Sequence, residues 1–247
     1  MQWPSVEELN AMTLQVGLVG NDGIVLASDR LFQSYEYQTR SVSRGSKFLS
    51  GAGVICCCSG DSLAEQSAYG VRDYDWTAVV SSDVEANQSA LRQIGNTAFR
   101  NMQTQFGTVR NVVSKVLVVL HEDQLWLLDA TVHNGCTARL VPDRQVTGDI
   151  GNTCRYFMNK YANFSNLRPV SELISLAAYT ILAAGEENPY GVGGLEIYVI
   201  PTHKPPILLS AAQEQELEIW FKEAAESIRD RLLHPFDYAG ANANHNL

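Results

Sequence analysis

Two apolar β-type runs near the start of the chain, separated by a tight-turn signal, determine the topology of its first part. The runs span residues 14–19 and 24–28, and Asn21, Asp22 and Gly23 lie between them. Asn, Asp and Gly tolerate positive φ, and this turn chemistry between β-formers is a strong hairpin signal. The sequence therefore predicts that the two runs pair as antiparallel strands.

The same hairpin predicts that a threonine and an aspartate become neighbours. If the turn is centred on residues 21–22 or 22–23, Thr13 lies opposite a residue between about 30 and 32. Asp29 then falls within one or two residues of Thr13 across the ladder. A hydroxyl and a carboxylate are thus expected side by side at one end of the pair.

The order of the remaining patterns favours two antiparallel sheets packed together, with helices outside. Residues 31–46 are polar and are interpreted as a loop or an irregular excursion before a second hairpin, 47–50 and 54–59. Helical periodicity follows from residue 62 and from residue 84, and returns later in the chain. The further elements expected are strands at 113–120, 125–130, 137–141, 195–200 and 207–210, and helices at 152–161, 170–184 and 213–233.

Composition and charge limit the classes of partner. The 247 residues carry a formal net charge of −9, which argues against nucleic acid and anionic membranes as partners. The chain shows neither a secretory signal nor an uncharged apolar run of transmembrane length, so a cytoplasmic protein is predicted. We expect one domain over 13–236, with 1–12 as a leader or a misassigned start and 237–247 as a flexible tail.

The cysteines and histidines do not suggest a metal site. Three of the five cysteines are consecutive, Cys56 to Cys58, within an apolar run that is typical of a core strand. Consecutive strand residues alternate faces, so these sulfurs cannot converge on one ion. The five histidines lack ligand spacing. Reduced structural thiols are predicted, with no cofactor and no metal.

A threonine can act as a nucleophile if a base takes its hydroxyl proton, and the α-amine of an N-terminal threonine can be that base. The reference pKa of such an amine, about 7.7 to 8.0, leaves a useful neutral fraction near physiological pH. Lys47 would lower the pKa of hydroxyl and amine, and Asp29 would hold Lys47 in place. The backbone N–H of Gly60, between a core strand and a helix, suits an oxyanion.

These residues resemble a known family. The resemblance is to a proteasome β-type subunit, an N-terminal nucleophile hydrolase, and it is carried by the stretch 13–29, the Lys47-Phe48 pair, the strand exit 58–61 and the run 193–200. A bacterial-type proteasome homologue is favoured over a eukaryotic subunit. The resemblance covers about residues 13 to 235. It implies an α+β fold, a four-layer αββα sandwich, in homo-oligomeric stacked rings with a possible unfoldase or regulator. It also implies an endopeptidase that acts on peptides or unfolded proteins through an acyl-enzyme on Thr13.

The chain departs from the family pattern in the groups that support the nucleophile. The family usually has Asp and Ser shortly before the late Gly-Gly pair, whereas residues 187–192 here read Glu-Asn-Pro-Tyr-Gly-Val. A supporting Ser would fall within 147–151, where Asp149 is the expected substitute. The predicted catalytic set is therefore Thr13, Asp29, Lys47, Gly60 and Asp149.

The catalytic interpretation requires Thr13 to be N-terminal. Two routes would expose its amine: translation that begins at Met12, followed by removal of that methionine, or autolytic removal of the leader. If neither happens, Thr13 is an ordinary strand residue. Two alternatives therefore stay open: a non-catalytic proteasome-like ring or scaffold subunit with a retained leader, and a small-molecule amidase of the same fold.

Overall fold

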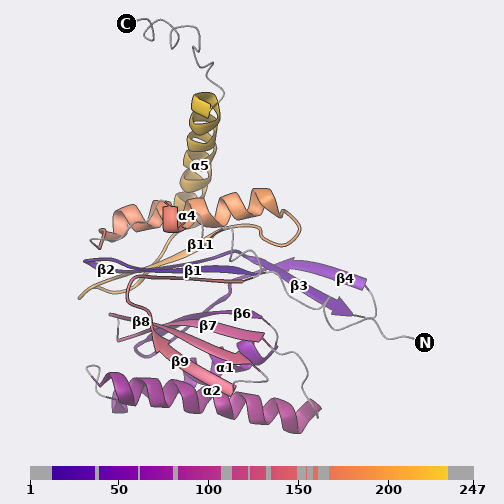
Figure 1. The fold of residues 1–247 in the computed structure, drawn as a ribbon, viewed down its shortest axis with the longest axis vertical. Helices are drawn as coiled ribbons and strands as arrows, with labels where there is room; N and C mark the ends of the chain where they lie inside the picture. The colour runs from indigo at the N-terminus through magenta and orange to yellow at the C-terminus, as the bar shows by residue number, and fades with distance from the viewer. Residues whose placement is uncertain are drawn as a thin grey trace, which may run out of the picture.

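Two five-stranded antiparallel sheets stack face to face and helices cover the outer face of each, so the layers run helix, sheet, sheet, helix (Figure 1). This architecture confirms the predicted α+β, four-layer αββα fold. The computed structural model describes residues 13–36, 39–60, 62–79, 83–106, 113–121, 123–131, 135–148, 154, 158–160 and 167–232. The proposed leader and tail, and most of the helix expected at 152–161, lie outside these residues.

The first sheet contains the opening hairpin at its centre. From one edge to the other it consists of β10 (Arg144–Gly148), β1 (Leu14–Val19), β2 (Gly23–Ser28), β11 (Glu196–Pro201) and β12 (Ile207–Leu208). The predicted antiparallel pairing is confirmed, with Gln15 opposite Ser28 and Val19 opposite Ile24. The sequence did not predict β10, because Val146 is the one apolar residue in its polar run.

The second sheet follows chain order. It consists of β5 (Phe48–Gly51), β6 (Val54–Gly60), β7 (Val113–Leu120), β8 (Gln124–Thr131) and β9 (Gly135–Leu140). Each strand is antiparallel to the next.

Helices form the two outer layers. The second sheet is covered by α1 (Ser62–Asp73) and α2 (Val84–Phe106), and a 3-10 helix, η2 (Trp76–Ala78), lies between them in the chain. The first sheet is covered by α4 (Val170–Glu187), and α5 (Ala211–Leu232) packs on α4. The Tyr179 ring of α4 meets the Phe221 ring of α5 at 5.0 Å, and α5 then projects away from the layers (Figure 1). Within the described residues, no helix combines the length and apolar character needed to cross a membrane.

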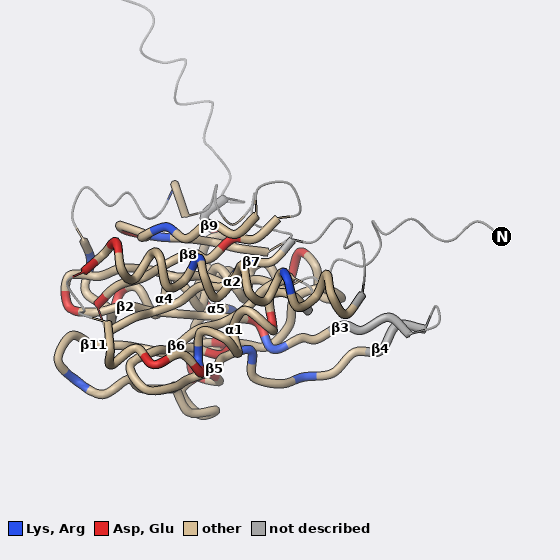
Figure 2. The backbone as a smooth tube through the Cα atoms, turned by 90° about the horizontal axis from the view of Figure 1, so that it is seen from below, with Lys and Arg blue, Asp and Glu red and all other residues tan. Residues whose placement is uncertain are grey.

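The polar segment 31–46, which was expected to be a loop or an irregular excursion, contains regular strands. Most of it forms a separate two-stranded hairpin, β3 (Leu31–Glu36) and β4 (Thr39–Arg44), which extends away from the sheets (Figure 2). Aromatic and β-branched residues, including Phe32 and Val42, favour strands within this polar sequence. The base of the hairpin continues directly from β2, and this continuity places its first residues beside Asp29.

Strand β1 is buried on both faces, and its side chains point alternately toward α4 and toward the second sheet. Leu14, Val16 and Leu18 belong to the apolar cluster under α4. Gln15 and Gly17 alternate with them and therefore face the second sheet. A Cβ on Gly17 would lie 2.9 Å from the Leu125 side chain, so the two sheets are in close contact here. Most of the layer between them is apolar, with Ile24, Leu26, Leu117 and Leu127 among its members.

Candidate active site

The β1–β2 register brings Asp29 next to the residue that follows Thr13. The backbone N–H of Leu14 donates to Asp29 Oδ1 at 2.8 Å, and the N–H of Asp29 donates to the Leu14 carbonyl at 3.1 Å. Thr13 and Asp29 are both buried. The neighbourhood predicted from the hairpin is therefore present, with Asp29 one residue along the ladder from Thr13.

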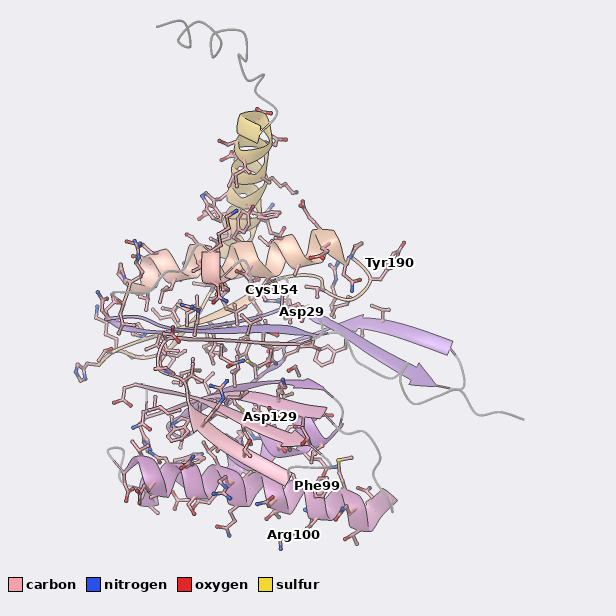
Figure 3. The ribbon with its side chains drawn as sticks, in the orientation of Figure 1. Asp29, Phe99, Arg100, Asp129, Cys154 and Tyr190 are labelled. Carbon is pink, nitrogen blue, oxygen red and sulfur yellow. The ribbon has the colours of Figure 1, made fainter. Side chains whose placement is uncertain are left out.

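Asp29 is an anchor for three donors. Its Oδ1 accepts from Leu14 N–H and from Lys47 Nζ, each at 2.8 Å, and its Oδ2 accepts from Leu31 N–H at 3.0 Å. The residue lies where the first sheet meets the base of β3 (Figure 3). Burial raises the pKa of Asp29, and Lys47 and the two backbone amides act in the opposite direction. These three donors therefore favour the ionised form of the Asp29 carboxyl group, which burial alone disfavours.

Lys47 completes a buried trio. It directly precedes β5, and its side chain is 2% exposed. Its Nζ lies 2.8 Å from Asp29 Oδ1 and 3.1 Å from Thr13 Oγ1, and the Phe32 ring centroid is 5.2 Å away. Burial lowers the pKa of Lys47, while the charge of Asp29 raises it. Two opposite charges in this apolar setting each need the other to remain ionised.

This arrangement can activate a hydroxyl. As an ammonium, Lys47 donates a hydrogen bond to Thr13 Oγ1 and stabilises negative charge that develops there. Because burial moves the pKa of Lys47 downward, the side chain is also closer to exchanging its proton than an exposed lysine is. The structure therefore brings together three of the five predicted residues, Thr13, Asp29 and Lys47.

Gly60 ends β6, two residues before α1 begins at Ser62. Its φ is +124°, a conformation that glycine adopts at far lower cost than other residues. The strand-to-helix exit expected from the sequence is therefore present. The role of the Gly60 N–H as an oxyanion donor stays a prediction.

Asp149 lies outside the described residues, and its supporting role stays a prediction. The residue before it, Gly148, is opposite Leu14 in the β1–β10 ladder and has a φ of +117°. A Cβ on Gly148 would overlap the carbonyl oxygen of Thr13. The backbone of β10 therefore supports Thr13 at a distance that only glycine permits.

Replacing Gly148 with alanine is expected to destabilise the protein by about 2 to 4 kcal/mol, because backbone strain and a backbone clash act together. Gly53→Ala is the matched control, since Gly53 also has a positive φ, +74°, but no atom lies within 4 Å of a Cβ built there. Urea unfolding of both variants measures the difference. Equal losses in the two proteins would contradict a close approach of β10 to Thr13.

A second polar group, which was not predicted from the sequence, is close in the chain to this trio. Thr147 Oγ1 donates to Gln15 Oε1 at 3.0 Å, and Ser59 Oγ donates to Thr147 Oγ1 at 3.2 Å. The available signal was Gln15 itself, a polar residue within a strand that is apolar at its other inward positions. Thr147 could not be found in the same way, because β10 was not predicted as a strand.

A third polar contact connects Arg30, two residues after β2, to the start of α5. Arg30 Nη2 lies 2.9 Å from both carboxylate oxygens of Glu214 and 4.0 Å from Glu196 Oε1. Burial raises the pKa of Glu214, and the Arg30 charge opposes this shift. Arg30 follows Asp29 directly, so this ion pair ties α5 to the backbone of the site.

The thiols behave as expected from the alternation of strand residues. Cys56 packs under the helices and Cys57 between the sheets, and all five cysteines are free. Burial raises the pKa of Cys58 to about 11, which keeps it a thiol at neutral pH. Among the described residues, no group of three or more His, Cys, Asp or Glu side chains could hold a metal ion.

Comparison with known proteins supports the fold. No family model matches the chain, and no curated protein matches it. Anbu (ancestral beta-subunit) from Yersinia bercovieri aligns with a TM-score of 0.65 at 11% identity, over 91% of this chain and 98% of that one. Anbu from Hyphomicrobium sp. strain MC1 aligns with 0.62 at 10%, over 91% and 99%. Anbu from Pseudomonas aeruginosa aligns with 0.61 at 11%, over 91% and 98%.

These findings correct the family suggested by the sequence. The assignment to proteasome β-type subunits, as a bacterial proteasome homologue, is wrong: the similar structures are Anbu proteins, and neither a family model nor a curated sequence supports the assignment. Short motifs around Thr13, Lys47 and Gly193 misled the assignment because one architecture imposes similar turns and strand ends on divergent chains. The chain shares the overall fold of these Anbu structures.

Proposed function

We propose that this chain is a threonine-type N-terminal nucleophile hydrolase, an endopeptidase in which Thr13 attacks the amide carbonyl. The observation that carries the proposal is the buried trio, in which Lys47 Nζ contacts both Thr13 Oγ1 and Asp29 Oδ1. A lysine held by a carboxylate and aimed at a hydroxyl on a strand end suits nucleophile activation. The shared fold agrees with this chemistry.

The reaction requires a free α-amine on Thr13, produced by loss of Met12 or by cleavage of the leader. The amine accepts the Oγ1 proton while Oγ1 bonds to the carbonyl carbon. Lys47 stabilises the developing alkoxide, and the N–H of Gly60 donates to the carbonyl oxygen. As the C–N bond breaks, the amine passes its proton to the leaving nitrogen and an ester remains on Thr13. Water, deprotonated by the same amine, then cleaves the ester and restores the hydroxyl.

Asp29 orients this machinery, and Asp149 is the proposed further support of the nucleophile. Asp29 holds Lys47 and the Leu14 amide with one oxygen, so it fixes the activating group relative to the strand end that carries Thr13.

The proposed substrates are peptides or unfolded proteins, which are hydrolysed within a homo-oligomer of stacked rings. The Pseudomonas aeruginosa structure is described as a helical assembly of the Anbu complex, which supports self-association of a similar fold. An unfoldase or regulator would deliver folded substrates. The free cysteines fit a cytoplasmic location, where thiols stay reduced.

The test uses a chain that begins at Thr13 and a peptide epoxyketone, which needs both the hydroxyl and the α-amine of an N-terminal threonine. Intact mass and peptide mapping are expected to show one adduct per chain, on Thr13, together with hydrolysis of unstructured peptides. A preparation whose leader is intact by mass should give no adduct.

The alternatives predict other results. A scaffold subunit would keep its leader and take no label. A small-molecule amidase would be labelled but would prefer small amides to a peptide library. Peptide hydrolysis by a protein with an intact leader would overturn the proposal.

A further inference from the structure

A short chain of hydrogen bonds crosses from one sheet to the other beside the trio. Ser59 on β6 belongs to the second sheet, and its hydroxyl donates to Thr147 on β10 of the first sheet at 3.2 Å. The Thr147 hydroxyl donates to Gln15 on β1 at 3.0 Å. The three residues are at most 5% exposed. We call Gln15, Thr147 and Ser59 the inter-sheet network.

Each member of the inter-sheet network is close in the chain to a part of the proposed machinery. Gln15 lies two residues after Thr13, Ser59 directly precedes Gly60, and Thr147 directly precedes Gly148. Gly148 in turn supports the Thr13 carbonyl through its close approach. The network therefore connects the three backbone segments that would carry the nucleophile, its support and the oxyanion donor.

The composition of the network does not suit a purely structural role. Most of the layer between the sheets is apolar, and hydrophobic pairs would fill these positions without polar atoms. Gln15 Nε2 is buried and has no hydrogen-bond partner among the described residues. An unpaired buried donor destabilises a fold, so polar groups arranged in this way beside a site indicate a functional constraint.

We infer that Gln15, Thr147 and Ser59 are positioning residues, which set the separation between Thr13 Oγ1 on one sheet and the Gly60 N–H on the other. The inference rests on the proposed function. The two groups must meet the same carbonyl from opposite sheets, and small errors in such a geometry cost large factors in rate. Lys47, next to β5 of the second sheet, contacts Thr13, next to β1 of the first sheet. The inter-sheet network adds a second polar contact between the sheets, from Ser59 on β6 to Thr147 on β10.

The test compares stability with catalysis in a chain that begins at Thr13. The double variant Gln15→Met with Thr147→Val replaces both hydrogen-bond partners by apolar groups of similar size, while Ser59 keeps the Lys115 carbonyl at 3.4 Å. The urea midpoint should stay close to that of the wild type, because no additional polar group is left unpaired. We expect kcat to fall about 10- to 100-fold with KM within about twofold.

Two further variants separate positioning from packing. Thr147→Ser keeps the hydroxyl and is expected to retain most of the wild-type kcat. Thr180→Val is the matched control, because Thr180 is also buried and its hydroxyl contacts groups outside the inter-sheet network: it donates to the Leu176 carbonyl within α4 at 2.8 Å and lies 3.4 Å from Met158 Sδ. Its kcat should equal that of the wild type.

The outcomes distinguish this inference from the function on which it rests. If the wild-type chain hydrolyses peptides and the double variant keeps the wild-type kcat, the inference is wrong and the proposed function stands. The inference is also wrong if, in both the double variant and Thr180→Val, kcat falls in proportion to the loss of stability. If the wild-type chain that begins at Thr13 neither hydrolyses peptides nor takes the label, the proposed function falls and this role with it.

Discussion

Replacing Thr13 with alanine, in a chain that begins at this residue, is expected to lower kcat for peptide hydrolysis at least about 10,000-fold. The variant keeps an α-amine but has no oxygen that can form an ester. Folding should change little, because Lys47 retains its contact with Asp29 when the Thr13 hydroxyl is removed. Initial rates with a fluorogenic peptide, measured beside urea melts, test both parts.

Thr13→Ser is the matched control for this loss. Serine supplies the same hydroxyl and amine, so clear turnover is expected even if the missing methyl group loosens the orientation of the side chain. Hydrolysis by the alanine variant at more than about a hundredth of the wild-type rate would place the nucleophile elsewhere.

Replacing Lys47 with methionine is expected to lower kcat about 100- to 1000-fold and the free energy of unfolding by about 3 kcal/mol. Methionine fills the space of the lysine stem but cannot donate to Thr13 Oγ1. It also removes the cation that pairs with the buried Asp29 carboxylate, which then keeps its two backbone donors. Lys204→Met, at an exposed turn, serves as the control and should change neither quantity.

The stability loss of Lys47→Met should depend on pH in a defined direction. Burial already raises the pKa of Asp29, and Lys47 is the strongest opposing influence, so its removal raises this pKa further. A carboxyl group whose pKa is higher in the folded state favours folding at low pH, and this contribution is lost as pH rises through the folded pKa. The deficit relative to wild type should therefore be smaller at about pH 5 than at about pH 7.5. A deficit that grows on acidification would contradict the buried carboxylate.

The central hairpin and the position of Asp29 could be predicted from the sequence because they depend on local chemistry. Asn21, Asp22 and Gly23 determine the turn, and the ladder then determines which residues meet. Lys47 could be proposed only through a resemblance. Its approach to Thr13 depends on how the second sheet packs on the first, which no local pattern encodes.

The parts that sequence reasoning missed are polar strands. The β3–β4 hairpin and β10 lack the apolar alternation by which strands are recognised. The segment of the hairpin was therefore interpreted as a loop or an irregular excursion, and β10 was not predicted. The pairing of Ser59 with Thr147 went unnoticed for the same reason. The resemblance identified the architecture correctly and the family wrongly, because chains that are only 10–11% identical share this fold, so a shared fold does not fix the family.

The three donors around Asp29 decide which mutations can be interpreted. Its two oxygens hold the amides of Leu14 and Leu31 as well as the Lys47 ammonium, so even asparagine would set an NH2 group against a backbone N–H. If an Asp29 variant were inactive, the assay would not distinguish loss of the local structure at the strand ends from loss of the catalytic chemistry. Mutation is therefore informative at Lys47, because its Nζ contacts the side chains of Thr13 and Asp29 and, among the described residues, no backbone group.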